Sequence, residues 1–270
     1  MNLNDLSTQL LFTTAQIWSE RSDNSVQTGT AFFYNYVSES DPNKVIPFLI
    51  TNYHVIRDGR KGVVELSEGS DAATPKIGST VRVEVDLNIP HNYINEKLDI
   101  AIIPIGHALN ALKDNGKIAF YRSIGKELLP NAIQISELAA LEEIVFIGYP
   151  SGLRDKHSGL PIIRRGITAS PVWSNFDGKS QFLIDAGVFP GSSGSPVFIL
   201  NQGSYSTKNG ISIGSRLMFL GVLTQSMLRP ESSANVYLGL GIVAHSREVV
   251  NFIDDVGAEL FKQLSNNTLQ

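Results

Sequence analysis

Short apolar runs recur along the whole chain, separated by turns rich in Gly, Pro and Asn, and they predict β-strands. In the first half, the predicted strands are 28–36, 45–52, 63–66, 80–85 and 99–105. In the second half, they are 143–148, 164–173, 181–186, 196–200, 218–225 and 237–244. Residues 80–85 alternate apolar and polar side chains, which indicates one face in water. No helix recurs between the strands, so the pattern predicts an all-β barrel or sandwich.

Helical spacing is predicted only near the two ends of the chain. Leucine, alanine and isoleucine residues recur at near-helical intervals between residues 5 and 19, where Asp5 or Ser7 could cap a helix. Ser246 is a suitable N-cap for a second helix that continues to about residue 264. Residues 106–140 are less regular, and we interpret them as a connection that contains one helical turn at 108–112.

Composition restricts the function classes. Of 270 residues, 42% are hydrophobic, enough for a sizeable core, while 18% are charged, with a net charge of −4. A nucleic-acid partner is not expected, because it would need a basic face. The absence of cysteine excludes disulfides and thiol catalysis, and it favours a reducing, cytoplasmic location. The polar N-terminus does not resemble a signal peptide, and no run of 18 apolar residues predicts a membrane span.

The segment 189–198 carries the most specific chemistry. It connects two predicted buried strands through a turn rich in glycine and serine, and glycines allow backbone angles that other residues avoid. Such a turn can direct backbone N–H groups toward one point, as an oxyanion site requires. We therefore predict Ser193 as a nucleophile, with the N–H groups of Gly191 and Ser193 as oxyanion donors. Taken alone, the segment is equally consistent with an ordinary turn.

A serine nucleophile needs a base and an acid that orients the base, and both have candidates upstream. His54 follows the apolar run 48–50, and Asp99 precedes the strongly apolar run 100–103. The order His, Asp, Ser is one of three known chain orders for this triad. Asp86 is an alternative acid, and Ser195 is an alternative nucleophile.

These motifs resemble those of trypsin/chymotrypsin-fold serine peptidases, nearest to bacterial trypsin-like members of the Deg/HtrA-type branch. The resemblance extends from about residue 25 to about residue 253, with no PDZ-like segment after it, and is carried by the segments 29–33, 51–55, 98–101, 147–152, 185–186, 191–196, 221–224 and 239–244. It implies two six-stranded antiparallel β-barrels. We expect an N-terminal helix at about 5–19, a first barrel at about 25–120, a second at about 140–245, and a C-terminal helix at about 246–264.

The resemblance implies a serine endopeptidase with its site in the cleft between the barrels, restricted specificity and regulated activation. Protein or peptide substrates are expected, and a regulatory protein partner is a further expectation. No cofactor is implied, and the remaining histidines lack metal-ligand spacing, so no metal site is predicted. The alternative is a binding or scaffold protein on a peptidase fold that no longer cleaves.

By the same resemblance, the substrate pocket is formed by Gly187, Val188, Thr224, Gln225, Ser226 and Gly241. No acid aligns with the pocket floor of trypsin, so we expect a small or medium apolar residue before the scissile bond rather than Arg or Lys. Ser192 occupies the position where trypsin-like zymogens have an aspartate. Because Ser192 has no charge to pair with a new N-terminal amine, activation by N-terminal insertion is not expected. A partner, an oligomer or a loop rearrangement could order the turn instead.

Overall fold

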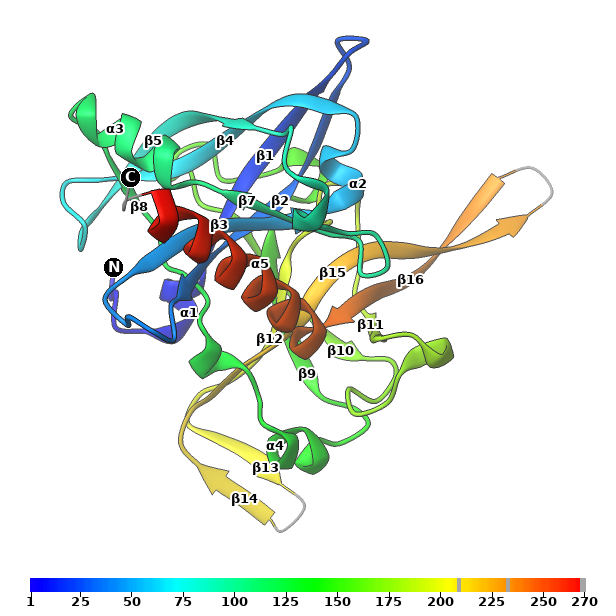
Figure 1. Cartoon of the computed structure of the whole chain (residues 1–270). Coiled ribbons are helices and arrows are strands. Elements are labelled where there is room, and N and C mark those ends of the chain that lie inside the picture. Colours follow the sequence, from blue (N-terminus) through cyan, green and yellow to red (C-terminus); the bar gives the residue numbers. More distant parts are fainter. Residues whose placement is uncertain (208–209, 232–233, 268–270) are drawn as a thin grey trace.

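The structure is a computed structural model of the chain, and it describes residues 1–207, 210–231 and 234–267. Its first half is an eight-stranded sheet in which strands follow the order β5-β4-β1-β2-β3-β7-β6, with β8 beside β4 (Figure 1). These strands are β1 (Thr14–Arg21), β2 (Val26–Val37), β3 (Val45–Asn52), β4 (Gly59–Gly69), β5 (Pro75–Asp86), β6 (Ile94–Asn95), β7 (Ile100–Pro104) and β8 (Ile118–Phe120).

The second half is a closed barrel of six antiparallel strands in the order β10-β11-β16-β15-β12-β9. Its strands are β9 (Glu143–Gly148), β10 (Ile162–Thr168), β11 (Gln181–Asp185), β12 (Pro196–Asn201), β15 (Arg216–Glu231) and β16 (Ala234–His245). Figure 1 shows that β15 and β16 continue beyond the barrel as a long hairpin. A separate hairpin, β13 (Ser204–Thr207) and β14 (Gly210–Ile213), projects from another side.

The helices are short except for the last. They are α1 (Leu6–Leu10), α2 (Tyr53–Ile56), α3 (Gly106–Asp114), α4 (Ala132–Glu137) and α5 (Ser246–Asn267). Single 3-10 turns occupy η1 (His91–Tyr93), η2 (Lys126–Leu128), η3 (Pro150–Gly152) and η4 (Phe176–Gly178). Among the described residues, no helix is both long and apolar enough to cross a membrane.

The all-β prediction is confirmed, and so is a six-stranded antiparallel barrel for the second half. In the first half, the described hydrogen-bonding ladder runs from β5 to β6 without a pairing between these two end strands. The physical reason is that β6 has only two residues and follows Pro90 and the turn η1, so it presents few backbone groups for pairing.

The predicted N-terminal helix at 5–19 is wrong beyond its first turns. Helix α1 ends at Leu10, and residues 14–21 form β1, which pairs with both β2 and β4. Ala15 and Ile17 were interpreted as one stripe of a helix, but two residues apart they also share one face of a strand, where both are fully buried. The apolar pattern of residues 14–21 fits a helix or a strand, and pairing with β2 and β4 makes the segment a strand.

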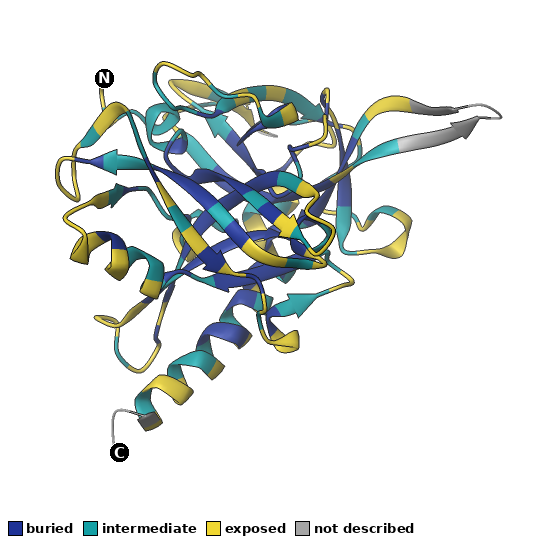
Figure 2. Ribbon diagram, turned by 90° about the horizontal axis from the view of Figure 1, so that it is seen from above, coloured by how far each residue is buried: buried dark blue, intermediate teal, exposed yellow. Residues whose placement is uncertain are grey.

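A continuous hydrophobic cluster joins the two halves. It contains Phe32 and Phe48 from the first half, and Phe198 and Phe219 from the second. Val249, Val250, Ile253 and Val256 bring one face of α5 onto the same cluster. Figure 2 shows the buried residues concentrated in the central strands, whereas α5 carries exposed residues on its outer side. Helix α5 therefore holds both halves in one orientation, as a candidate site between them requires.

Candidate active site

His54 and Asp99 are brought together by adjacent strands of the first half. His54 lies in α2, directly after β3, and Asp99 immediately precedes β7, which pairs with β3. His54 Nδ1 lies 2.6 Å from Asp99 Oδ2, and the backbone N–H of His54 donates to Asp99 Oδ1 at 2.9 Å. The carboxylate therefore contacts His54 through both oxygens, which sets the orientation of the imidazole and leaves Nε2 for other chemistry.

The backbone at Asp99 is held in an uncommon conformation. Its φ of 55° lies in the left-handed region, where a side chain other than glycine is strained. Its carbonyl accepts two hydrogen bonds, from the Tyr53 N–H at 3.0 Å and from Asn52 Nδ2 at 2.8 Å. Asn52 is a residue that sequence reasoning missed as a contributor. Its position two residues before His54, at the end of a buried strand, is the signal that could have indicated it.

The turn around Ser193 depends on two glycines with positive φ. Gly191 has φ 86°, and a Cβ there would lie 2.5 Å from the Tyr149 carbonyl oxygen. Gly194 has φ 89°, and a Cβ there would lie 1.9 Å from the Thr30 carbonyl oxygen. Any side chain at either position would collide with backbone. Gly194 therefore allows the turn to approach the first half closely, and Gly191 allows it to approach the loop after β9.

Thr30 of β2 fastens the turn to the rest of the molecule. Its N–H donates to the Ser193 carbonyl at 2.9 Å, and its hydroxyl donates to the Gly191 carbonyl at 2.8 Å. The same hydroxyl accepts the Tyr149 N–H at 3.0 Å. Thr51 in turn donates its hydroxyl to the Thr30 carbonyl at 2.8 Å. One threonine, which sequence analysis did not single out, therefore connects three segments.

The two candidate oxyanion N–H groups and the Ser193 hydroxyl have no described hydrogen-bond partner. Within the described part of the chain, no hydrogen bond uses the backbone N–H of Gly191 or of Ser193. Ser193 is half-buried, whereas Ser192 and Ser195 are 1% and 0% exposed and their hydroxyls are buried with no described partner. Of the serines in this turn, Ser193 is the accessible one, so burial disfavours the rival Ser195.

The predicted triad is assembled in part. His54 and Asp99 are in direct contact, but the described residues include no hydrogen bond between His54 and Ser193. Gly194, the residue after Ser193, lies against Thr51, since a Cβ on Gly194 would be 2.9 Å from the Thr51 hydroxyl oxygen. Thr51 is three residues before His54 in the sequence. The rival acid Asp86 lies elsewhere, because it is exposed at the end of β5 and accepts from Asn88 in its own turn.

A cleft of about 1100 Å³ opens beside His54 and Asp99. Its walls come from both halves, and they include the predicted pocket residues Thr224 and Gln225. Two further predicted residues, Val188 and Gly241, pack against each other away from these walls, since a Cβ on Gly241 would lie 2.7 Å from Val188 Cγ2. Gly187 and Ser226 also lie outside the lining of this cleft. Of the six predicted pocket residues, Thr224 and Gln225 therefore line this cleft, and the other four do not.

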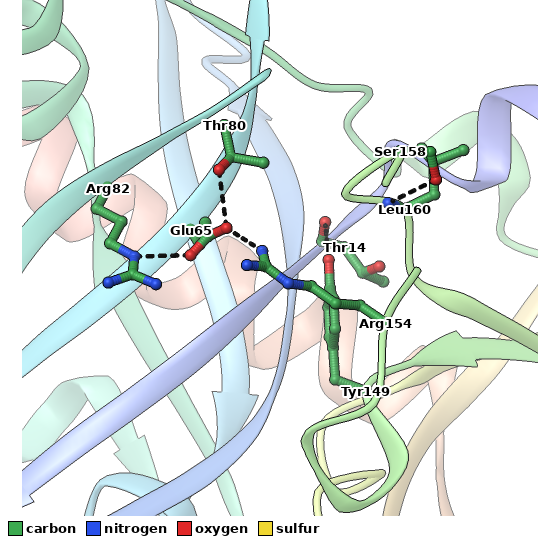
Figure 3. Close-up of polar contacts among 8 residues, drawn as sticks. All are labelled: Thr14, Glu65, Thr80, Arg82, Tyr149, Arg154, Ser158 and Leu160. Carbon is green, nitrogen blue, oxygen red and sulfur yellow. Dashed lines mark hydrogen bonds and ion pairs between the residues drawn. The ribbon is translucent and has the colours of Figure 1, made fainter. Parts of the chain in front are cut away.

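An ion-pair cluster ties the loop that supports the serine turn to the first half (Figure 3). The Glu65 side chain, 2% exposed, contacts Arg82 at 2.7 Å within its own sheet, accepts from Thr80 at 2.8 Å, and pairs with Arg154 of the second half. Arg154 belongs to the segment 149–160, whose Ser151 N–H donates to the Pro190 carbonyl, next to Gly191. The cluster therefore reaches the candidate oxyanion turn through one loop.

No group of three or more His, Asp or Glu side chains among the described residues could hold a metal ion. The arrangement instead contains a histidine oriented by a carboxylate, an accessible serine, and two free N–H groups in a glycine turn. Such groups can support acyl transfer through a serine nucleophile.

Comparison with protein families gives a direct match. The family model of the trypsin-like peptidase domain matches residues 29–204, which include His54, Asp99 and Ser193. The chain belongs to the trypsin-like peptidase family. No curated protein sequence is significantly similar to this trypsin-like chain.

Solved structures share the fold at low sequence identity. The HtrA-type protease AlgW with a tripeptide is 13% identical, with a TM-score of 0.51; the match covers 93% of this chain and 62% of that one. Deg5 is 14% identical, with a TM-score of 0.51 and coverage of 90% and 88%. HL collagenase is 14% identical, with a TM-score of 0.51 and coverage of 92% and 94%. The chain thus spans less than two thirds of the AlgW chain.

These likenesses establish a chymotrypsin-like fold, and the family match supports a serine protease. The predicted resemblance to trypsin-fold serine peptidases is confirmed by the family match, and the HtrA-type and Deg structures share the fold.

Proposed function

We propose that the chain is a serine endopeptidase that hydrolyses peptide bonds through His54, Asp99 and Ser193. The observation that carries the proposal is the two-point contact between the Asp99 carboxylate and His54, at 2.6 and 2.9 Å, beside a cleft between the two halves. Family membership supports peptide substrates.

In this proposal each of the three residues has one role. The Ser193 hydroxyl attacks the peptide carbonyl, and its proton passes to Nε2 of His54. Asp99 holds the imidazole with Nδ1 protonated and stabilises the imidazolium that forms. The negative oxygen of the tetrahedral intermediate binds the free N–H groups of Gly191 and Ser193. His54 then gives its proton to the leaving amine, and water releases the acyl group by the same steps in reverse.

His54 and Ser193 share no hydrogen bond among the described contacts, so catalysis requires a side-chain rotation or a movement of the turn that brings the Ser193 hydroxyl to His54 Nε2. Catalytic hydrogen bonds are often long in proteins without substrate and tighten once it binds. This requirement is consistent with regulated activation, in which a substrate or a regulatory protein partner orders the turn.

A fluorophosphonate probe tests the nucleophile. We expect the wild-type protein to be labelled on Ser193, as mapped by mass spectrometry, and to hydrolyse a denatured protein substrate. Ser193→Ala should lose both activities while its melting temperature stays near that of the wild type. Ser195→Ala is the matched control, since its hydroxyl is fully buried without a described partner, and it should keep labelling.

Labelling that persists in Ser193→Ala would exclude Ser193 as the nucleophile. A folded wild-type protein with neither labelling nor hydrolysis would favour the alternative, a binding or scaffold protein on this fold.

A further inference from the structure

Arg164 of β10 presents a cation beside the segment that leads to Ser193. Its guanidinium lies 5.0 Å from the ring centre of Phe189 and 5.8 Å from that of Phe146. A Cβ added to Gly187 would lie only 2.8 Å from Nη2 of Arg164, so the guanidinium stands directly against the bare face of this glycine. Arg164 thus contacts Gly187, which sequence analysis assigned to the substrate pocket, and Phe189, two residues further along.

The charge of Arg164 is not neutralised within the described part of the chain. No described carboxylate lies within ion-pair distance of it, and none of its N–H groups donates a hydrogen bond to a described residue. Its neighbour Arg165 is different, because it forms an ion pair with Glu143 at 2.5 Å. A half-buried guanidinium has five donors in a planar fork and pairs most strongly with a carboxylate. The aromatic rings supply only cation–π contact to the face of the group.

The segment that Arg164 contacts leads directly to the candidate nucleophile, since Phe189 is four residues before Ser193. The Phe189 carbonyl accepts the Ser192 N–H at 3.0 Å, so residues 189–192 form a tight turn that Ser193 directly follows. The next residue along the segment, Val188, packs on Gly241 of β16, since a Cβ on Gly241 would lie 2.7 Å from Val188 Cγ2. A substrate side chain that passes Ser193 toward Gly187 would therefore approach the guanidinium.

We infer that Arg164 is a specificity-determining residue, and that the enzyme cleaves after Asp or Glu. This inference rests on the proposed function, because it places the acidic side chain relative to Ser193. It differs from the apolar preference expected from sequence, which was based on the floor residues 187–188 and on walls formed by 224–226 and Gly241, and which did not include Arg164. Arg164 comes from β10 and lies against Gly187 only in the folded barrel.

The first experiment measures cleavage of acetyl-Ala-Ala-Pro-Xaa coumarin amides with Glu, Asp, Gln, Leu or Lys at Xaa. We expect wild-type kcat/KM for Glu or Asp to exceed that for Gln by about a hundredfold, as for a charge pair shielded from water. Arg164→Gln should lose most of this ratio, and Arg164→Lys should retain part of it because it keeps the charge. Arg165→Gln is the matched control and should leave the ratio unchanged, since Arg165 pairs with Glu143.

The second experiment separates this inference from the proposed function. Calorimetry would measure binding of acetyl-Ala-Ala-Pro-Xaa-Ala-Ala amides to the Ser193→Ala protein, which cannot cleave them. Tighter binding of the Glu peptide than of the Gln peptide, abolished when Arg164→Gln is added, supports the role of Arg164 even if the wild type proves inactive.

Equal binding of the two peptides, or a wild-type cleavage profile led by Leu or Lys, would overturn the inference while leaving a serine peptidase in place. A Glu preference that survives in a folded Arg164→Gln protein would also overturn it. Thermal melts of each variant establish that the compared proteins are folded.

Discussion

The two halves of the molecule prepare their parts of the candidate site in different ways. The first half positions His54 and Asp99 with its own hydrogen bonds, from adjacent strands and from Asn52 and Tyr53. The second half carries Ser193 in a turn whose shape depends on contacts with the first half, above all with Thr30. The acid–base pair is thus organised locally, whereas the nucleophile turn is organised across the interface.

This difference has a consequence for stability and regulation. A change among the residues that hold Asp99 and His54 within the first half should affect the orientation of His54 without altering the turn. A change at the interface should affect Ser193 and the oxyanion N–H groups together, because they share one turn. Loss of interface contacts is therefore the expected route to an inactive but folded state, and each variant below tests one side of the comparison.

The largest effect is expected for Gly194→Ala. The added Cβ would lie 1.9 Å from the Thr30 carbonyl oxygen, and φ at this position is 89°. We expect a loss of about 3 kcal/mol in the free energy of unfolding and loss of fluorophosphonate labelling, since steric strain and a forced backbone shift add together. Urea denaturation and labelling measure the two effects.

Gly203→Ala is the control for Gly194→Ala. Gly203 has almost the same φ, 88°, but a Cβ there would meet nothing within 4 Å. Gly203→Ala should lower the free energy of unfolding by only about 1 kcal/mol, the cost of a left-handed backbone at alanine. The variant should still be labelled by the fluorophosphonate. Equal effects of the two substitutions would show that the contact with Thr30 is unimportant.

An intermediate effect is expected for Arg154→Ala. This change leaves the buried Glu65 with Arg82 and Thr80 but removes the ion pair that crosses between the halves. We expect about 2 kcal/mol lower stability, because a partner of a buried carboxylate is lost. We also expect a lower kcat with little change in KM, because the loop 149–160 supports the turn.

Arg82→Ala is the matched control for Arg154→Ala, because it removes a second partner of the same carboxylate on one side of the interface only. The Arg82 side chain is largely exposed, so its removal should cost less than about 1 kcal/mol and leave kcat unchanged. If Arg82→Ala lowers kcat as much as Arg154→Ala does, the ion pair across the interface has no special role in positioning the turn.

The smallest effect is expected for Asn52→Ala, inside the first half. The Asp99 carbonyl would keep the Tyr53 N–H and lose the Asn52 side chain. We expect about 1 kcal/mol lower stability, as for one hydrogen bond, and a kcat reduced several-fold with an altered pH profile, because His54 is oriented less firmly. Asn88→Ala, an exposed residue that bonds within its own turn, is the control. An unchanged pH profile in Asn52→Ala would remove Asn52 from the positioning of Asp99.

Strand positions could be predicted from the sequence where an apolar run is buried in the folded sheet and ends at turn residues. Strands β3 and β9 coincide with the predicted ranges, since both are apolar runs bounded by clear turn residues. Strand β1 could not be predicted, because its short pattern also fits a helix and only pairing with β2 and β4 decides between them. The extension of β15 and β16 was likewise not predicted. Backbone pairing between these strands continues beyond the apolar runs 218–225 and 237–244 from which their ranges were predicted.

The sequence by itself determined the chemical types and their order, a histidine, an aspartate and a serine in a glycine turn, because each lies beside an apolar run that marks its strand. Only the tertiary structure decided how these residues are supported, through Thr30, Asn52 and the Glu65–Arg154 pair, and which cation faces Gly187. The physical reason is that these contacts join residues far apart in the chain, and strand pairing and barrel closure, rather than local sequence, bring such residues within hydrogen-bonding distance.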